Sequence, residues 1–558
     1  MVTKVLHLLY REVRGLHQAA YVLALFTLAS QILAIVRDRL LASQFGAGYE
    51  LDVYYTAFRI PDLLFVLFAS VLSVYVLLPF VARAEEESPS SGRQVLAQVF
   101  SLFLMLYTVI AAVTFATADW LVPWLFPGFT TEAYSEIVTL LRILLLQPLL
   151  LGISSLFGVV TQMNHRFVLY ALSPLLYNIG IIFGVAVLFP FFGMAGLAYG
   201  VVLGALGHLL VQWPLVRTSG LNFSFVRTFD WPAMWAIAQV AIPRAFTLSL
   251  GQLQMIVLVA LASTMTIGSV AVLQLALNLQ SVPLAIVGMS YSVAAFPVLT
   301  ELLAKRDSAK FNAYVSTALR HIIFWSLPII ALVIVLRAQM VRVLLGGGSF
   351  NWDDTRLTAA ALGIFIITLA AQALLLLLVR AFYAGGRTRT PLLLTALGVT
   401  VGTGMSFVLY QLYQVNGQFA EAVTAFLRLD NVAGVEVLML PLGYACGVLL
   451  ELVIMLVVFR FTYNFPLRDL WRPCWQGIAA ATAGGVAAYL TLAFIVEGVN
   501  QDTFIGIFIQ GAAGGVFGVA AILVVYTLLD SQELHELTRS FRARLFKTDV
   551  VAPQPDII

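Results

Sequence analysis

The chain has 558 residues, of which 61% are hydrophobic and only 11% are charged. Soluble proteins are about 45–50% apolar and about 25% charged, so this composition excludes an ordinary soluble domain and indicates an integral membrane protein. The net charge of +3 gives no indication of a nucleic-acid partner. Cys446 and Cys474 lie in apolar surroundings, without disulfide or metal-ligand spacing, and are interpreted as small buried hydrophobic residues.

The first segment, residues 1–17, carries Lys4, Arg11 and Arg14 among apolar residues, and no small-residue cleavage pattern follows it. We therefore expect a basic segment at the membrane surface and not a cleavable signal. Apolar stretches of about 20 residues cross a bilayer as helices, and the rest of the chain contains fourteen of them. They cover residues 18–44, 51–82, 94–126, 132–162, 167–190, 194–217, 231–264, 268–302, 310–345, 354–385, 391–412, 435–460, 471–496 and 503–529.

The loops between these stretches differ strongly in charge. Loops such as "RTSGLNFSFVR" and "AKRDSAK", together with both chain ends, hold most of the Lys and Arg residues, whereas "FGAGYE", "FPGFTT" and "TMTIG" hold none. The positive-inside rule places the basic set and both termini in the cytoplasm. One external loop, residues 413–434, is long and contains a weakly amphipathic piece.

The tail from Ser531 to Lys547 puts Leu534, Leu537 and Phe541 on one helical face, with basic residues beside them. This pattern fits a helix on an anionic membrane surface and equally a solvated helix.

Two parts of the chain match at a separation of roughly 220 residues. Pro79 and Pro297 each precede a charged cytoplasmic loop, and "LFPGFTTEAYSEIVTLLRILL" parallels "LLGGGSFNWDDTRLTAAALGIF". We therefore predict that spans 1–6 and 7–12 are parallel repeats, with spans 13 and 14 appended. Parallel repeats are related by an axis along the membrane normal, and substrate binds where they meet. The alternative is chance similarity between apolar helices.

The predicted class is an all-α integral membrane protein with two parallel six-helix repeats around a central cavity and two appended helices. Its expected parts are a basic surface segment (1–17), an N-lobe (18–217), a cytoplasmic linker (218–230), a C-lobe (231–460), the appended spans (461–529) and a cytoplasmic amphipathic tail (530–558).

Charges within the first two spans are the strongest functional signal. A charge at bilayer depth costs at least ~2.5–3.5 kcal/mol, so it usually faces a wet cavity or a partner. Ser30 and Arg37 are seven residues apart and share a helical face, as do Asp52 and Arg59. Pro61 is expected to kink its helix. The structural alternative is an Asp52–Arg59 or Arg37–Asp52 pair that locks two helices together.

Other polar residues are candidates for a pathway or for coupling. They are Gln31, Gln252 and Asn278 as substrate contacts, and Asp38, Pro61, Arg244, Arg380 and Glu451 as gating or coupling residues. Helix-joining hydrogen bonds are the common alternative for such residues. Glycines at four-residue spacing, such as Gly196, Gly200 and Gly204, predict close helix packing. No Walker sequence, metal-ligand cluster or nucleophile–base arrangement is present, so we predict neither an enzyme nor a cofactor.

The segment "VRDRLLASQFGAGYELDVYYTAFRIPDLL" closely resembles the start of the MurJ (MviN) family, the lipid II flippases of bacterial cell-wall synthesis. The similarity continues in "SPLLYNIG", "SVPLAIVGMSYSVAAFPVLTELLA" and "AFYAGGRTRTP". The resemblance implies a fourteen-span fold of the MOP exporter superfamily, in which the last two spans form a lipid-binding groove. It also implies transport of a polyprenyl-pyrophosphate-linked glycopeptide to the outer leaflet, in the bacterial cytoplasmic membrane, with cell-wall synthesis proteins as further partners.

The resemblance places Arg37 and Asp52 at positions important for transport, and Arg59 at a basic position in many members. Several family residues differ here. Where the family has a Ser-Arg pair in span 1, this chain has Ser30-Gln31. Phe65 and Asn278 replace two further cavity arginines of the family. Ser70 replaces a family acid, and Leu258 replaces an acid associated with sodium binding. Arg37 is the one central arginine that clearly matches.

These departures keep alternatives open. A related flippase for another undecaprenyl-linked saccharide, a small-molecule antiporter of the same superfamily, and a non-transporting scaffold for wall synthesis are the competing hypotheses. Outward movement of an anionic headgroup is expected to use the membrane potential or a sodium or proton gradient.

Overall fold

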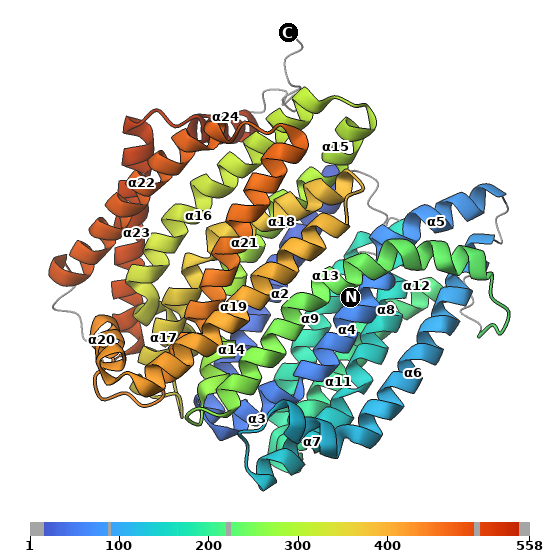
Figure 1. Cartoon of the computed structure of the whole chain (residues 1–558), viewed down its shortest axis with the longest axis horizontal. Coiled ribbons are helices and arrows are strands. Elements are labelled where there is room, and N and C mark those ends of the chain that lie inside the picture. Colours follow the sequence, from blue (N-terminus) through green and yellow to red (C-terminus); the bar gives the residue numbers. More distant parts are fainter. Residues whose placement is uncertain (1–15, 88–90, 165, 219–224, 496–502, 546–558) are drawn as a thin grey trace. The chain divides into compact units, whose positions relative to one another are not determined.

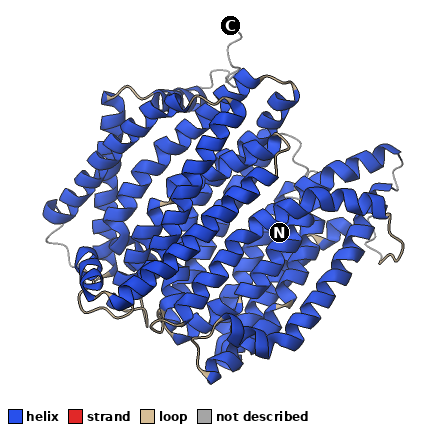
Figure 2. Ribbon diagram, viewed as in Figure 1, coloured by secondary structure: helices blue, strands red, loops and turns tan. Residues whose placement is uncertain are grey.

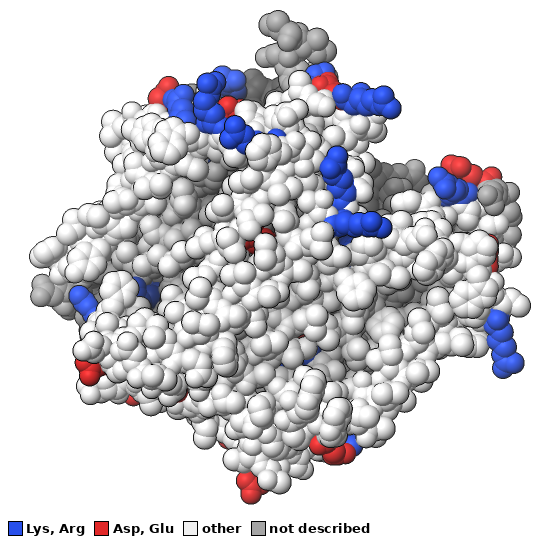
Figure 3. Space-filling view, viewed as in Figure 1, with Lys and Arg blue, Asp and Glu red and all other residues white. Residues whose placement is uncertain are grey.

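The computed structural model describes residues 16–87, 91–164, 166–218, 225–495 and 503–545. Within these ranges all regular elements are helices (Figure 1; Figure 2), and a single β-bridge joins Gly347 and Phe350. The predicted all-α class is therefore confirmed. Most of the face drawn in Figure 3 is neither acidic nor basic, as expected for a surface that contacts lipid.

The helices follow the predicted apolar stretches closely. Their bounds are α2 (Leu16–Phe45), α3 (Tyr49–Ala57), α4 (Arg59–Val71), α5 (Val74–Glu87), α6 (Ser91–Leu125), α7 (Thr131–Leu144), α8 (Leu146–Met163), α9 (Phe167–Phe183), η1 (Gly184–Leu188), α10 (Phe189–Phe192), α11 (Met194–Leu210), α12 (Trp213–Thr218), α13 (Trp231–Ser263), α14 (Ser269–Leu284), η2 (Ala285–Met289), α15 (Ser290–Ala304), α16 (Ser308–Leu345), α17 (Trp352–Ile367), α18 (Leu369–Ala384), α19 (Arg389–Val415), α20 (Gly417–Leu427), η3 (Val435–Leu438), α21 (Met439–Tyr463), η4 (Leu467–Leu470), α22 (Trp471–Leu490), η5 (Thr491–Ile495), α23 (Phe504–Leu528) and α24 (Gln532–Leu545).

In the described part of the chain, 12 spans are long and apolar enough to cross a membrane, and up to 13 if the bent pair α17–α18 is one span. The first predicted span, residues 18–44, corresponds to α2, a helix of 30 residues that carries three charges in its last third. The predicted count of fourteen is reached when the bent pair α17–α18 and α2 are both counted as spans.

The chain forms two compact units, each built from several segments. Unit 1 comprises Met1–Ala276, Leu344–Thr358 and Thr388–Gly447, and unit 2 comprises Leu277–Val343, Ala359–Arg387 and Val448–Ile558. Four helices, α14, α16, α17 and α21, have residues in both units.

In unit 1, α9 packs along α2 and α11, and α4 packs along α13. The α9–α11 contact depends on glycine, because a methyl group at Gly180 would lie 2.2 Å from the Cα of Gly204. At Gly184 a methyl group would lie 2.7 Å from the Cα of Gly200. The predicted role of these glycines in close helix packing is therefore confirmed.

The second span is interrupted at two places. The first break, at Phe58, separates α3 from α4 just before Pro61, whose ring removes a helical hydrogen bond; the predicted effect of Pro61 is confirmed. The second break, at Leu72–Ser73, corrects the prediction of a continuous span over 51–82. There the Ser70 and Ser73 hydroxyls donate to the carbonyls of Val66 and Ser70, which competes with regular helix hydrogen bonding.

Two further spans are broken at positions that correspond in the predicted repeat. In unit 1, α7 ends before Leu145, and the Tyr107 hydroxyl donates to the Leu145 carbonyl. The second pair, α17 and α18, bends by 43° at Thr368. At this bend the Gln280 amide donates to the Phe365 carbonyl at 2.9 Å and to Thr368 Oγ1 at 3.0 Å. Both breaks leave carbonyls that a neighbouring helix satisfies.

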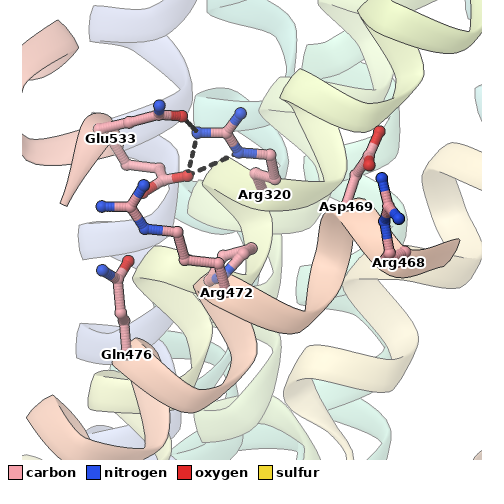
Figure 4. A pocket seen from close by; sticks show the side chains of 8 residues that line it. Arg320, Arg468, Asp469, Arg472, Gln476 and Glu533 are labelled. Carbon is pink, nitrogen blue, oxygen red and sulfur yellow. Dashed lines mark hydrogen bonds and ion pairs between the residues drawn. The ribbon is translucent and has the colours of Figure 1, made fainter. Parts of the chain in front are cut away.

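In unit 2, α24 packs back onto the membrane helices. Leu534 is buried in a cluster with Phe324, Tyr526 and Ile522. Figure 4 shows the polar side of this contact, where Arg320 of α16 binds Glu533 at 2.7 Å. The first turns of α24 therefore dock on protein, which corrects the expectation of a helix lying wholly on lipid or in solvent. The apolar face alone could not distinguish these three partners.

Glu533 is held in its charged form by this contact. Burial disfavours the charge, but the backbone, the Ser531 hydroxyl and the Arg320 guanidinium outweigh it and lower the pKa of Glu533 below its ordinary value. Ser531 Oγ donates to Glu533 Oε2 at 2.8 Å. The docking of α24 thus depends on an ionised carboxylate.

Candidate functional site

Arg37 is the centre of a buried polar cluster on α2 and α9. Its Nε donates to Asp38 Oδ1 at 2.8 Å, and its Nη1 donates to Asn178 Oδ1 at 3.1 Å. Asn178 in turn donates to Ser30 Oγ at 3.2 Å. The predicted common face of Ser30 and Arg37 is therefore confirmed, because one asparagine binds both side chains.

Two of the Arg37 N–H groups have no partner among the residues that the structure describes. A guanidinium has five N–H groups, and the contacts with Asp38 and Asn178 occupy three of them. Its side chain is 20% exposed, so the remaining donors are not fully enclosed. Tyr55, an electrostatic neighbour of Arg37, has a buried hydroxyl with no hydrogen-bond partner among the described residues. Arg37 and Tyr55 therefore both retain hydrogen-bonding capacity after their contacts with the described residues are counted.

Arg59 is buried, and both of its hydrogen-bond partners, Tyr55 and Gln274, belong to unit 1. Its Nε donates to the Tyr55 carbonyl at 3.0 Å, across the break between α3 and α4, and its Nη2 donates to Gln274 Oε1 at 2.6 Å. The contact with Gln274 joins the first predicted repeat to the second. Arg59 therefore helps to hold a helix break in place.

Asp52 has a different role from the one that its charge suggests. Its Oδ2 accepts from the Gly268 backbone N–H at 2.6 Å, and its Oδ1 accepts from the Ala271 backbone N–H at 2.8 Å. These amides belong to the first turn of α14 and the residue before it, so Asp52 caps that helix from another span. Neither an Asp52–Arg59 nor an Arg37–Asp52 pair forms, which corrects that alternative: each arginine has closer partners.

The α14 cap is part of a larger contact that we call the loop cluster. It comprises five segments of unit 1, residues 43–48, 126–130, 264–271, 347–354 and 428–436. The Ser349 N–H donates to the Ser43 carbonyl at 2.8 Å, and the Gly128 N–H donates to Ser263 Oγ, at the end of α13, at 3.3 Å. Backbone groups therefore join the loops of the first predicted repeat to those of the second.

Glycines allow the loops of this cluster to approach so closely. Gly268 has φ +94°, and a methyl group there would lie 2.0 Å from the Ala47 carbonyl oxygen. Gly348 has φ +52°, and its methyl group would lie 2.1 Å from the Ser43 carbonyl oxygen. Both positions need the left-handed backbone and the small volume of glycine. The loop cluster is consequently a tight, backbone-built closure at one end of unit 1.

The other predicted residues lie on the spans. Gln31 and Gln252 are half-buried on α2 and α13, and neither makes a hydrogen bond among the described residues. Arg244 lies on α13, directly after Pro243. Their predicted roles in binding or coupling stay predictions.

Unit 2 contains the remaining candidates. Arg380 donates to Met289 Sδ at 3.5 Å. Glu451 is buried on α21 and interacts with another group, so it is not isolated. Asn278 is half-buried on α14.

The sequence analysis did not identify three residues that contact the predicted site residues or the loop cluster. Asn178 lies in the "SPLLYNIG" segment, and this Asn in an apolar span was the available signal. Gly268 and Asp354 lie in the loops, and Asp354 Oδ2 accepts from the Ala47 N–H at 3.4 Å. Nothing local in the sequence marks these long-range contacts. Among the described residues no group of His, Cys, Asp and Glu could hold a metal ion.

The helix arrangement and the buried polar cluster define this protein as a polytopic α-helical membrane protein. Comparison with protein-family models gives a match to "Lipid II flippase MurJ" over residues 41–425. The chain therefore belongs to the MurJ family.

Individual relatives agree with this assignment. The chain is 28% identical over 413 residues to a probable lipid II flippase MurJ of Rhizobium tropici, covering 72% of this chain and 77% of the relative. It is 27% identical over 403 residues to the lipid II flippase MurJ of Burkholderia cenocepacia, covering 70% and 78%.

Solved structures show the same fold. A lipid II flippase MurJ in an inward closed conformation matches with a TM-score of 0.71 and 20% identity, covering 91% of this chain and 99% of that one. An inward-facing multidrug resistance MATE transporter of the MOP superfamily matches with a TM-score of 0.65 and 15% identity, covering 78% and 94%. The likeness at these identities concerns the fold.

Proposed function

We propose that this protein moves lipid II from the inner to the outer leaflet of the bacterial cytoplasmic membrane for peptidoglycan synthesis. The observation that carries the proposal is the family match over residues 41–425, which includes most of the predicted repeats. Transport across the bilayer forms and breaks no covalent bond, so the protein needs no catalytic residue for this activity.

Arg37 is the residue that we assign to the headgroup. A pyrophosphate presents several anionic oxygens, and arginine binds two of them at once through its planar fork. Arg37 has N–H donors without a partner among the described residues, and Tyr55, whose hydroxyl also has none there, interacts with it electrostatically. Asp38 and Asn178 orient the guanidinium, while Ser30 fixes Asn178.

The loop cluster supplies the barrier that transport requires. Its loops belong to the set that we predict to face outward, so the substrate enters from the inner leaflet while the cluster is closed. Release to the outer leaflet then requires that the backbone contacts at Ser43, Gly268 and Ser349 separate. We propose that the membrane potential, worth ~2.3 kcal/mol per charge per 100 mV, or a sodium or proton gradient drives this cycle.

A second candidate is a flippase for another undecaprenyl-linked saccharide. It is favoured by Gln31, Phe65 and Asn278, which stand where the family resemblance places cavity arginines. Fewer cations around the headgroup would suit a substrate with less charge. A wall-synthesis scaffold is the remaining non-transport hypothesis, and it predicts that Arg37 is dispensable.

The test is rescue of a bacterium depleted of its own MurJ, with exposure of newly made lipid II on the outer surface as the readout. We expect the wild-type chain to restore exposure and Arg37→Ala to fail at equal expression. Arg217→Ala, which removes an exposed arginine at the end of α12, is the matched control and should rescue fully. Absence of rescue by a correctly inserted wild-type chain would favour the other saccharide or the scaffold.

A further inference from the structure

The segment between α19 and α21 has two parts with different environments. Its first part is α20, a helix of 11 residues without a buried side chain, capped by Asn416, which accepts from the Phe419 N–H at 3.1 Å. The second part, residues 428–438, which we call the strap, is anchored by Leu429, Val435 and Leu438, all at most 3% exposed. The strap therefore has a fixed position in unit 1, unlike an ordinary long loop.

Two polar contacts attach the strap to other segments of unit 1, the 264–268 turn and the start of α17. Glu436 Oε1 accepts from the Thr266 backbone N–H at 3.1 Å and from Thr266 Oγ1 at 2.5 Å. Arg356, in the first turns of α17, donates from Nη2 to the Arg428 carbonyl. Gly434 has φ +83°, and a methyl group there would lie 3.4 Å from Leu357 Cδ2 and 3.5 Å from Thr266 Cβ, so the strap passes close to both residues. The strap thus contacts the turn before α14 and the start of α17 at once.

Asp52 and Glu436 bind the same turn. Asp52 accepts from the Gly268 N–H, and Glu436 accepts from both donors of Thr266, two residues earlier. The turn lies just before the N-terminus of α14, where unpaired N–H groups and the helix dipole favour negative charge. Two carboxylates from distant parts of the chain therefore stabilise one conformation of this turn.

We propose that Glu436 is a positioning residue of the transport cycle, which holds the 264–268 turn in the closed loop cluster through the strap. The inference rests on the proposed function, because it assigns the loop cluster to the closed state of a transporter. When the cluster opens, the Glu436–Thr266 bonds break, so Glu436 sets the fraction of molecules that are open. Asp52 binds the Gly268 and Ala271 N–H groups and Glu436 binds Thr266 just before them, so opening of the turn also loosens the first turn of α14 around Ala271.

The experiment measures opening directly and needs no lipid II. Ala271, fully buried in the loop cluster, is replaced by cysteine in a chain that carries Cys446→Ser and Cys474→Ser, and the purified protein in lipid nanodiscs is reacted with a maleimide. We expect Glu436→Ala to raise the labelling rate by about fivefold, the factor that corresponds to about 1 kcal/mol. Glu436→Gln keeps an oxygen acceptor and should give a rate within about twofold of the parent.

Controls separate local opening from general loss of structure. Glu421→Ala removes an exposed acid from α20 and should leave labelling unchanged. A cysteine at the buried Ala480 of α22 reports on unit 2, and its labelling should not respond to Glu436→Ala. Thr266→Val removes one donor without removing the charge and should raise labelling of the Ala271→Cys protein by about threefold.

An unchanged rate at the Ala271→Cys site in both Glu436→Ala and Thr266→Val would overturn the proposal. Equal acceleration at the Ala480→Cys site would also overturn it, since Glu436 would then serve general stability. If labelling behaves as expected while the rescue experiment fails, the positioning role stands and the proposed substrate is wrong.

Discussion

Arg37 and Asp52 are two charges in the first two spans, and the structure uses them in opposite ways. Arg37 binds side chains and keeps N–H donors that have no partner among the described residues. Asp52 gives both oxygens to backbone N–H groups of a distant helix turn. The comparison shows that a charge at membrane depth indicates a ligand site only when hydrogen-bonding capacity remains after the fold has formed.

The largest effect should come from Asp52→Asn. The variant places an amide N–H₂ against a backbone N–H and removes the charge from both bonds, so we expect a loss of about 4 kcal/mol in the free energy of unfolding. Denaturation in detergent micelles measures it. Glu50→Gln, two residues away on α3, is the matched control and should change stability little. A stable Asp52→Asn protein would mean that Asp52 is available to substrate, as Arg37 is.

The next effect tests the turn that Asp52 caps. Gly268→Ala places a methyl group 2.0 Å from the Ala47 carbonyl oxygen, at a backbone φ of +94°. We expect the free energy of unfolding to fall by about 3 kcal/mol. Gly386→Ala, at the end of α18, is the control, because its φ is +70° but nothing lies within 4 Å; backbone strain alone should cost about 1 kcal/mol. Equal melting temperatures for the two variants would show that the loop cluster adapts easily.

Arg37→Lys tests whether Arg37 serves substrate binding and not stability. Lysine keeps the charge but loses the fork that binds two oxygens, so we expect about a tenfold slower appearance of lipid II outside, equivalent to about 1.4 kcal/mol. The free energy of unfolding should change by less than about 1 kcal/mol, because the pair with Asp38 survives. A large loss of stability with normal transport would reverse the roles that we assign to Arg37 and Asp52.

The smallest effect concerns a carboxylate outside the membrane. The pKa of Glu533 is lowered in the folded protein, so its ionised form stabilises docking of α24 above its ordinary value near 4.5. This contribution is lost as the pH falls through the lowered value. We expect α24 to become more susceptible to protease only when the pH falls below the ordinary carboxyl range, with a change of about 1 kcal/mol or less. Glu533→Gln should show the same susceptibility at neutral pH, and a pH-independent α24 would contradict the assignment.

Much of the fold could be predicted from the sequence because it follows local rules. Spans follow from apolar length, the break before Pro61 from the missing N–H, and the close packing of α11 from its glycine spacing, although the spacing does not identify α9 as the partner. The common face of Ser30 and Arg37 follows from helical periodicity. Each of these depends on residues that are close along the chain.

The site could be predicted only in part, because its bonds join distant segments. Nothing near Asp52 shows that its partners are Gly268 and Ala271, and nothing near Arg59 indicates Gln274. The apolar face of α24 likewise fits lipid, solvent or protein, and only packing against Phe324 and Tyr526 decides. Sequence identifies which residues carry charge, but tertiary packing determines which charges stay available.

The bends at Leu145 and Thr368 have a consequence for exchanging parts of this chain. Their freed carbonyls are satisfied by Tyr107 of α6 at the first bend and by Gln280 of α14 at the second. These donors lie on spans that do not correspond in the predicted repeat, so each bend depends on a neighbour of its own. A chimera that exchanged α7–α8 for α17–α18 would therefore lack a suitable donor at the joint. The two helix pairs are not interchangeable parts.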